Sequence, residues 1–204
     1  KILEENTHRL SESEREKLKE KIADVIKKQT TFILFEHKKE ISEFTGYKKF
    51  DPEKMKNMIL YILQKTGETY RTKINKLLWY MDFYHFKHFS VSISGNFYIH
   101  LNYGPIPDNY EFLLGELLNQ GMIEEKEVVF DYTKDISGEM IRAKVPFERN
   151  IFSKTELESM DYVLKKFKNF TSSQIMKKSH EELPYRKTKE GEKISYNLAS
   201  EISI

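Results

Sequence analysis

The sequence predicts an α+β fold that is predominantly α-helical: a helical core, a small antiparallel β-hairpin and an N-terminal helical arm. Apolar residues recur at helical spacing from Pro52 to Gly67, over 71–89 and again after Ser153. Two segments, 127–132 and 140–146, are separated by polar turn formers, which predicts the hairpin. Residues 1 to about 50 carry only a narrow apolar seam, which is typical of an exposed helix.

Composition limits the classes of protein that remain. The chain has 204 residues, of which 39% are hydrophobic and 32% charged, as expected for one globular domain with an appendage. No apolar run approaches the roughly 20 residues that cross a bilayer, and no signal-peptide core is present, so we expect a cytoplasmic protein without membrane contact. The absence of cysteine excludes disulfides, iron–sulfur clusters and thiol catalysis. The net charge of +2 gives no overall field of one sign.

The arm is predicted to be helical from Ser11, which forms an S-x-x-E capping box with Glu14. Its apolar seam consists of Leu18, Ile22, Val25 and Ile26, and its mixed charges fit either a solvated helix surface or a dimer or linker helix. The segment 30–35 fits a short strand or a further helical turn. Gly46 and Asp51-Pro52 mark the boundary, so we expect an arm over 1–50 and a main domain over 51–204. The start at Lys1 rather than Met suggests that the chain begins inside a longer one.

The main domain opens with two helices. Pro52 suits a first helical turn and Gly67 ends the first apolar pattern, while the second helix, 71–89, is apolar on two sides and should be central and mostly buried. Short extended segments are expected over 90–101, around Gly95. Gly104, Pro105 and Pro107 then predict a sharp turn, followed by a helix from about Pro107 to Gln120 that stops at Gly121.

The hairpin is followed by two further capping boxes. Ser153 with Glu156 opens one helix, and Thr171 with Gln174 opens a shorter one that should end near Glu182, before Leu183-Pro184. The tail contains one apolar extended stretch, 194–196.

Catalytic signatures are missing. Asp82, His85 and His88 lie three residues apart on one helix, but steps of three rotate the first and third side chains apart by roughly 120°, so they diverge instead of enclosing a metal. We expect Asp82 and His85 to satisfy each other or nearby backbone. There is no G-x-S-x-G elbow, P-loop or G-x-G-x-x-G fingerprint. We therefore expect no enzyme activity, no catalytic residue, no cofactor and no metal site.

Nucleic-acid binding is a competing interpretation, because aromatic residues between Trp79 and Phe112 lie near Lys73, Lys76 and Lys87. The balanced charge and the helical spacing of the rings favour core packing. Trp79, Tyr80 and Tyr110 each combine a flat ring with a polar tip, which suits an interface hot spot as well as a half-buried core position.

The run TKINKLLWYMDFYHFKHF, followed by SGNFYIHLNYGPIPDNYEFLL and the C-terminal SHEELPYRKTKEGEKISY, resembles the SocA-like antitoxin domain, also called the Panacea domain. The resemblance spans about residues 52–196. Members often carry tryptophan after the final proline, where this chain has Tyr185. The resemblance implies an antitoxin of a bacterial or phage toxin–antitoxin pair that neutralises a cognate toxin by direct contact, without catalysis. It also leaves open an adaptor role that delivers the toxin to a protease.

The resemblance transfers eight motif residues to this chain. They are Lys76, Tyr80, Asp82, His85, Gly104, Pro105, Pro107 and His180. Asp82, His85 and His180 fit either a buried hydrogen-bonded cluster or a surface that meets the toxin.

Partner contact is expected on a concave face between the central helix and the Gly/Pro turn, and Trp79, Tyr80, Asp108, Asn109 and Tyr110 are the candidate contact residues. On this hypothesis Trp79→Ala and Tyr110→Ala weaken toxin binding without unfolding the domain. The alternative is a DNA-binding transcriptional regulator, in which the arm or a missing upstream helix-turn-helix domain contacts DNA and this domain senses a partner.

Overall fold

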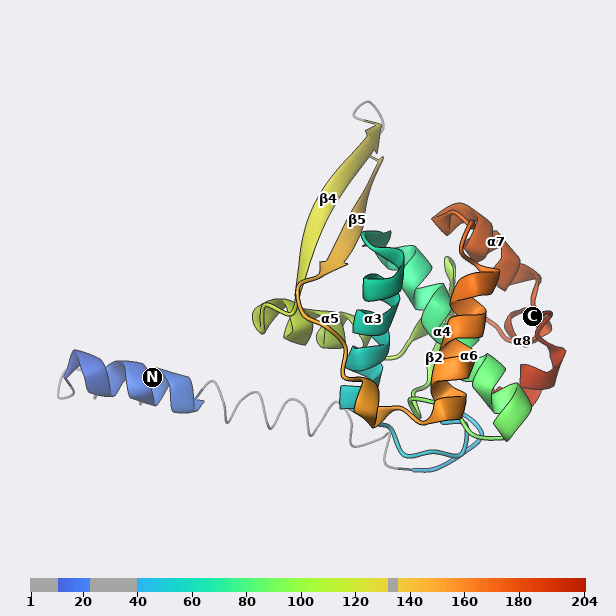
Figure 1. Ribbon diagram of the computed structural model, residues 1–204, viewed down its shortest axis with the longest axis horizontal. Helices are drawn as coiled ribbons and strands as arrows, with labels where there is room; N and C mark the ends of the chain where they lie inside the picture. Colours follow the sequence, from blue (N-terminus) through green and yellow to red (C-terminus); the bar gives the residue numbers. More distant parts are fainter. Residues whose placement is uncertain (1–10, 23–39, 132–135) are drawn as a thin grey trace. The chain divides into compact units, whose positions relative to one another are not determined.

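A computed structural model of the chain describes residues 11–22, 40–131 and 136–204, which belong to two compact units, Lys1–Lys39 and Glu40–Ile204 (Figure 1). In the first unit a helix spans 12–22. Its start confirms the predicted capping box, because the Ser11 amide donates to the Glu14 carboxylate at 2.8 Å and the Glu14 amide donates to Ser11 Oγ at 3.4 Å. The expected seam residues Val25 and Ile26 and the segment 30–35 lie outside the described residues.

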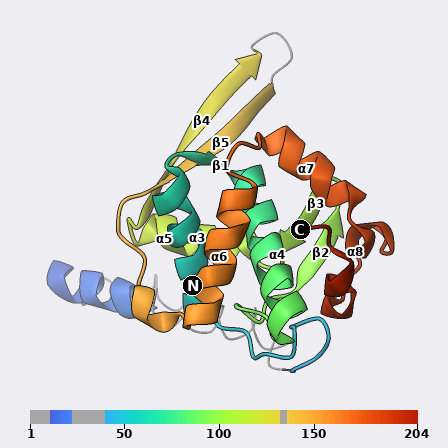
Figure 2. The same ribbon diagram turned by 45° about the vertical axis from the view of Figure 1, so that its right-hand side comes forward.

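The second unit is built around helix α4 (Arg71–Phe89), which lies beside α3 (Pro52–Thr66) and α6 (Lys154–Lys166) in Figures 1 and 2. Helix α4 also contacts α7 (Ser172–Glu181) and the 3₁₀ helix η3 (Tyr196–Glu201). Residues 74–83 are buried without interruption, so every face of this part of α4 is covered. On a helix that is buried on every face, each side chain must be apolar or have its polar atoms hydrogen-bonded to other protein groups. The prediction that this helix is central and mostly buried is confirmed.

The helix ends lie where local sequence signals place them. Asp51 caps α3 by accepting from the Lys54 amide at 2.9 Å, and Gly67, at φ +73°, ends it. Both predicted capping boxes, at the starts of α6 and α7, are formed. Each such cap satisfies amides that the first helical turn leaves unpaired, which is why these starts could be identified from sequence.

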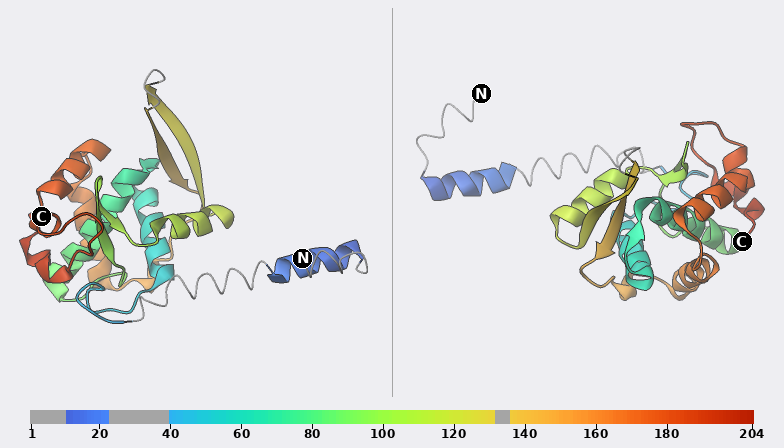
Figure 3. Two further views of the ribbon diagram at one scale, coloured as in Figure 1. Left: turned by 180° about the vertical axis from the view of Figure 1, so that it is seen from behind. Right: turned by 90° about the horizontal axis from the view of Figure 1, so that it is seen from above.

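The predicted hairpin is confirmed as β4 (Ile123–Asp131) and β5 (Ile136–Ala143), with the two-residue strand β1 (Thr69–Tyr70) on the other edge of β5. Figure 3 shows the hairpin extending away from the helices of its own unit. Strand β4 begins four residues earlier than predicted, with Ile123 opposite Ala143. This part of the strand was not predicted because residues 124–127 are all charged and show no apolar alternation. In the structure Glu124 forms an ion pair with Arg142, which lies opposite it on β5.

The predicted sharp turn at Gly104–Pro107 is wrong, because these residues form strand β3, antiparallel to β2 (Tyr98–Leu101). A two-residue turn joins Leu101 to Gly104. Hydrogen-bonded and non-bonded pairs alternate along an antiparallel ladder, so Pro105 and Pro107 occupy non-bonded positions where a missing amide costs nothing. Helix α5 (Tyr110–Asn119) consequently starts three residues later than predicted.

The C-terminal part is more helical than predicted. Helix α7 ends at Glu181, close to the predicted end before Leu183-Pro184. A short helix α8 (Leu183–Arg186), which was not predicted, then follows. The expected extended stretch at 194–196 does not form a strand, because Tyr196 already begins η3. The amides of Ile194 and Tyr196 donate to the carbonyls of Tyr98 and Glu43, at 2.8 and 3.0 Å. Among the described residues no helix combines the length and the apolar character needed to cross a membrane.

Candidate functional site

Asp82 anchors the loop that follows α4. Its carboxylate is fully buried and accepts hydrogen bonds from the amides of Ile93 and Ser94, at 2.7 and 2.8 Å, from Ser94 Oγ at 2.5 Å and from the Tyr98 hydroxyl at 2.7 Å. Burial raises the pKa of this carboxyl, while the four donors act in the opposite direction. Asp82 thus connects the central helix to the start of β2.

His85 holds the same loop from the next turn of α4. Its Nδ1 lies 2.7 Å from the Val91 carbonyl and its Nε2 lies 3.3 Å from Thr155 Oγ1, at the start of α6. Burial lowers the pKa of the imidazole. Asp82 and His85 therefore bond to neighbouring backbone rather than to each other, which was one of the two predicted arrangements. In the described part of the chain, no three His, Asp or Glu side chains are grouped as metal ligands would be.

Lys76 is a buried lysine of α4 that contacts strand β3, whereas Asp82 contacts the loop after α4. The side chain is 0% exposed, and its Nζ donates to the Pro105 carbonyl at 3.0 Å. Burial lowers its pKa to about 7. Gly104 makes this approach possible, because a Cβ there would lie 2.6 Å from Ser179 Oγ and 2.8 Å from Lys76 Cε. Its φ of +92° also favours glycine. The contact ties α4 to β3 and α7.

His180 lies near Lys76, whose charge acts on it. Asp82, His85 and His180 therefore do not form one cluster. The His180 ring stacks on Tyr185 at 4.7 Å, and His100 of β2 stacks on the same tyrosine at 3.7 Å. Burial, followed by the positive charge of Lys76, lowers the pKa of His180. The Tyr185 hydroxyl donates to the Leu101 carbonyl at 2.9 Å, so a phenol supplies a hydrogen bond where relatives often have an indole.

Tyr80 and Glu182 close the C-terminal end of the domain. The Tyr80 hydroxyl donates to Glu182 at 3.1 Å, and Glu182 also accepts from the Ser203 amide at 2.8 Å. Lys178 lies 3.3 Å from the same carboxylate. Burial and the neighbouring Glu182 raise the pKa of the phenol. Tyr80 is therefore a packing residue that fixes the last residues of the chain against α4.

The expected exposure of three contact candidates is contradicted. Trp79 and Tyr80 are 0% exposed and Tyr110 is 2% exposed. The Trp79 ring packs against Tyr80 at 4.7 Å and Phe83 at 5.0 Å, and Tyr110 begins α5 facing inward. Periodicity placed these rings correctly on helices but could not separate a half-buried position from a fully buried one. Trp79 and Tyr80 therefore cannot meet a partner in this conformation, and Tyr110, which contributes to the lining of a surface groove, exposes only 2% of its area there.

Asp108 and Asn109 are partly exposed, and they line a shallow groove of about 450 Å³ beside the β2–β3 hairpin. The apolar floor comes from Ile99, Leu101, Ile106, Pro107 and Phe112. Its lining includes Asp108 and Glu111 and contains no lysine or arginine, but Arg71, from outside the groove, pairs with Glu111 at 3.0 Å. This is the concave, partly apolar surface that partner recognition requires.

Two exposed residues of the β2–β3 hairpin were missed from the sequence, and one of them, Leu101, lines the groove. Tyr103, at the hairpin tip, is 70% exposed, and Leu101 is 36% exposed. The signal that could have found them is the alternation of Tyr98 to Leu101, closed by the two-residue Asn-Tyr turn. The prolines that follow made the segment resemble a loop.

Comparison with protein families gives one result: the model of the family described as "Antitoxin SocA-like, Panacea domain" matches residues 74–184. This range contains all but the first three residues of α4, both strand pairs, α5, α6, α7 and the start of α8. No curated protein and no solved structure is significantly similar to the chain.

Proposed function

Because this chain belongs to the SocA-like Panacea family of antitoxins, we propose that it neutralises a cognate toxin by direct protein–protein binding at the groove beside the β2–β3 hairpin. The observation that carries this choice is the exposure of Leu101 and Tyr103 next to an apolar hollow, on a hairpin held rigidly by buried motif residues. A rigid aromatic side chain loses little conformational entropy on binding, which suits an anchor residue.

The chemistry of the groove defines the toxin surface that would fit. An apolar side chain of the toxin would fill the floor between Leu101 and Phe112, and Lys or Arg side chains at its periphery would face Asp108 and Glu111. Exposed charges of opposite sign accelerate association and lose this effect as salt is added. The proposal therefore includes an association rate that falls with ionic strength.

The test is co-expression with a small protein that is encoded beside the gene of this chain and is lethal when expressed alone. Leu101→Asp should abolish growth rescue and co-purification of the toxin, because it places a charge in the apolar floor. Val129→Asp on β4 is the matched control, since Val129 is 37% exposed and Leu101 36%. If folded Leu101→Asp and Tyr103→Ala variants rescue growth fully, the groove is excluded. If rescue occurs without any detectable complex, direct binding is excluded.

Toxin abundance distinguishes two ways of neutralising. A masking antitoxin leaves the toxin present in an inactive complex, whereas a proteolytic adaptor lowers its amount. Immunoblots of the tagged toxin during rescue separate these cases, and we propose masking as the default because one docking groove is sufficient for it. Disappearance of the toxin in the presence of the antitoxin, reversed in a protease-deficient host, would establish the adaptor mechanism instead.

A further inference from the structure

Two helix N-termini meet at one hollow on the side of the domain where β1 joins α4. Helix α4 begins at Arg71 and α7 begins at Ser172, and their first turns lie close together in Figure 2. A hollow of about 460 Å³ is lined by Arg71 and Thr72 of α4, by Thr171, which caps α7, and by Ser172 and Ser173 of α7. The N-terminal end of a helix carries a partial positive charge and amides without a partner inside the helix. The capping box of α7 pairs the amides of Thr171 and Gln174 but does not involve those of Ser172 and Ser173. Two such helix ends favour an anion between them.

A buried side chain without a partner supports the same assignment. Asn75 lies one turn into α4, is only 6% exposed, and lines the hollow. Its Oδ1 has no hydrogen-bond partner among the described residues, and the same is true of Ser172 Oγ. Leaving a buried amide oxygen unpaired costs about 1–3 kcal/mol of stability, and a hydrogen-bond donor of a bound ligand would remove this cost at Asn75.

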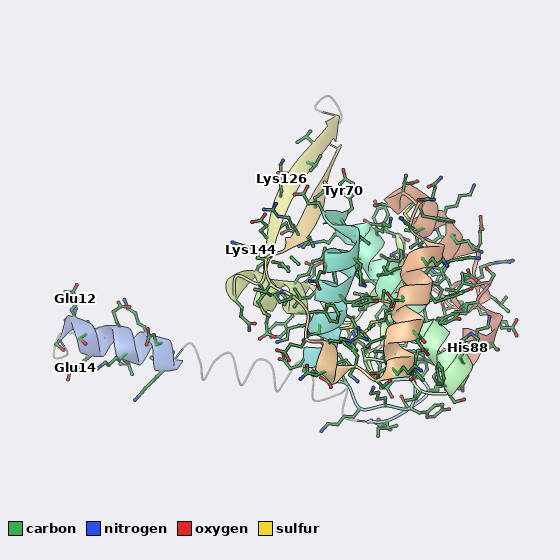
Figure 4. All side chains as sticks on the ribbon, in the orientation of Figure 1. Glu12, Glu14, Tyr70, His88, Lys126 and Lys144 are labelled. Atoms are coloured by element: carbon green, nitrogen blue, oxygen red, sulfur yellow. The ribbon has the colours of Figure 1, made fainter. Side chains whose placement is uncertain are left out.

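A second hollow, of about 620 Å³, adjoins the first and shares Tyr70, Thr171 and Ser172 with it. Figure 4 labels Tyr70 at this end of the domain. Four lysines line it, Lys65, Lys73, Lys165 and Lys168, against two acidic residues, Glu68 and Asp161. Its apolar walls include Tyr70 and Phe170, and Lys73 Nζ donates to the Phe170 carbonyl at 2.6 Å. In the first hollow, Arg71 is paired with Glu139 at 3.0 Å, and from outside this hollow Glu111 and Glu125 also contact its guanidinium, at 3.0 and 2.9 Å. The excess of positive charge in the two linings therefore comes from the four lysines of the larger hollow. The combined lining therefore favours an anion beside a flat apolar group.

We propose that these two hollows bind a phosphorylated small molecule. Its phosphate lies at the first turns of α4 and α7, with a polar group on Asn75, and its ring or apolar part occupies the larger hollow beside Tyr70 and Phe170. The site lies on elements other than the β2–β3 hairpin, so binding here does not require the groove. Free phosphate and the phosphate of a nucleotide share the chemistry of the smaller hollow, and only the nucleotide fills the larger one.

Calorimetric titration of the full chain at low salt tests the site, with inorganic phosphate, adenosine monophosphate and adenosine as probes. The monophosphate should bind at least tenfold more tightly than either of the other two. Ser173→Glu should weaken its binding at least tenfold, because a carboxylate at this position occupies the anion site, while the same carboxylate favours the helix start and preserves folding. Gln120→Glu, an exposed residue outside both hollows, is the control of equal charge change and should bind normally.

Asn75→Leu provides a second variant. It removes the unpaired oxygen with little change in volume, so its unfolding free energy should be unchanged or higher while affinity for the monophosphate falls several-fold. The proposal is overturned if none of the probes binds at millimolar concentration, if adenosine binds as tightly as its monophosphate, or if Ser173→Glu leaves the affinity unchanged.

Discussion

The buried ammonium of Lys76 should make the stability of the domain depend on pH. Burial lowers its pKa to about 7, whereas a lysine in the unfolded chain titrates near 10.5. Because the folded-state pKa is the lower one, the unfolded chain binds more protons between these values. The associated stability is complete above pH 10.5 and is lost as the pH falls towards 7. Lys76→Met keeps the chain length and the apolar stem but removes the titrating group.

The magnitude follows from proton linkage. Each pH unit between the two pKa values changes the free energy of unfolding by about 1.4 kcal/mol, and rounding near the lower pKa leaves about 2 kcal/mol between pH 7 and pH 9. The wild-type chain should therefore gain about 2 kcal/mol relative to Lys76→Met over this interval. At pH 7 the variant should be the more stable protein, because desolvation of the charge exceeds the value of one hydrogen bond to Pro105.

Urea unfolding measures this difference, with the fluorescence of Trp79, which is the single tryptophan and fully buried, as the probe. Comparing the two proteins at each pH cancels the titration of all other groups. Lys154→Met, whose wild-type side chain is 89% exposed, is the control and should show the wild-type pH dependence. Parallel stability curves for the wild type and Lys76→Met between pH 7 and 9 would refute the desolvation of Lys76 in the folded state.

Three further substitutions test the packing of the motif. Gly104→Ala should lower the free energy of unfolding by about 3 kcal/mol, because the positive φ and the 2.6 Å approach of Ser179 both oppose a Cβ; a loss below 1 kcal/mol would contradict this contact. Asp82→Asn should cost about 3 kcal/mol and speed hydrogen exchange at the amides of Ile93 and Ser94, since an amide cannot accept from all four donors; unchanged exchange would count against the anchor. Trp79→Ala should lower the free energy of unfolding, measured by circular dichroism, by about 3–5 kcal/mol instead of weakening toxin binding selectively. A stable variant that is defective only in binding would restore the hypothesis that Trp79 contacts the toxin.

Local signals in the sequence were sufficient for most helices of the main domain. Asp51-Pro52 and Gly67 bound α3, and the capping boxes at Ser153 and Thr171 start α6 and α7, because each of these residues satisfies or terminates backbone hydrogen bonds within its own turn. Strand β3 could not be predicted in the same way. Whether Pro105 is tolerated in a ladder depends on which side of the strand faces β2, and this is set by the register of a pairing and not by the proline itself.

The resemblance singled out residues of the buried scaffold, but it gave neither their arrangement nor the exposed residues Leu101 and Tyr103. The resemblance transferred Lys76, Asp82 and His85 from the helix motif and His180 from the C-terminal motif, and it left open a single cluster of Asp82, His85 and His180. The structure separates them, because side chains six residues apart on α4 point to different neighbours: Lys76 towards Pro105, Asp82 towards the loop before β2. The exposed fraction of a ring depends on what covers it from distant segments, so the burial of Tyr110 could not be read from its own helix.

The separation of buried motif from exposed groove explains what the family resemblance does and does not identify. Asp82 and Lys76 each join α4 to a segment distant in sequence, and losing either contact would disturb the scaffold. Leu101 and Tyr103 project from the hairpin that those contacts support, and exposed positions of this kind usually change stability by less than about 0.5 kcal/mol when substituted. A domain organised in this way can acquire a new partner by changing the hairpin and groove alone. The motif therefore identifies the scaffold of the SocA-like Panacea family, and on the function proposed above the choice of toxin depends on Leu101, Tyr103 and the acidic residues of the groove.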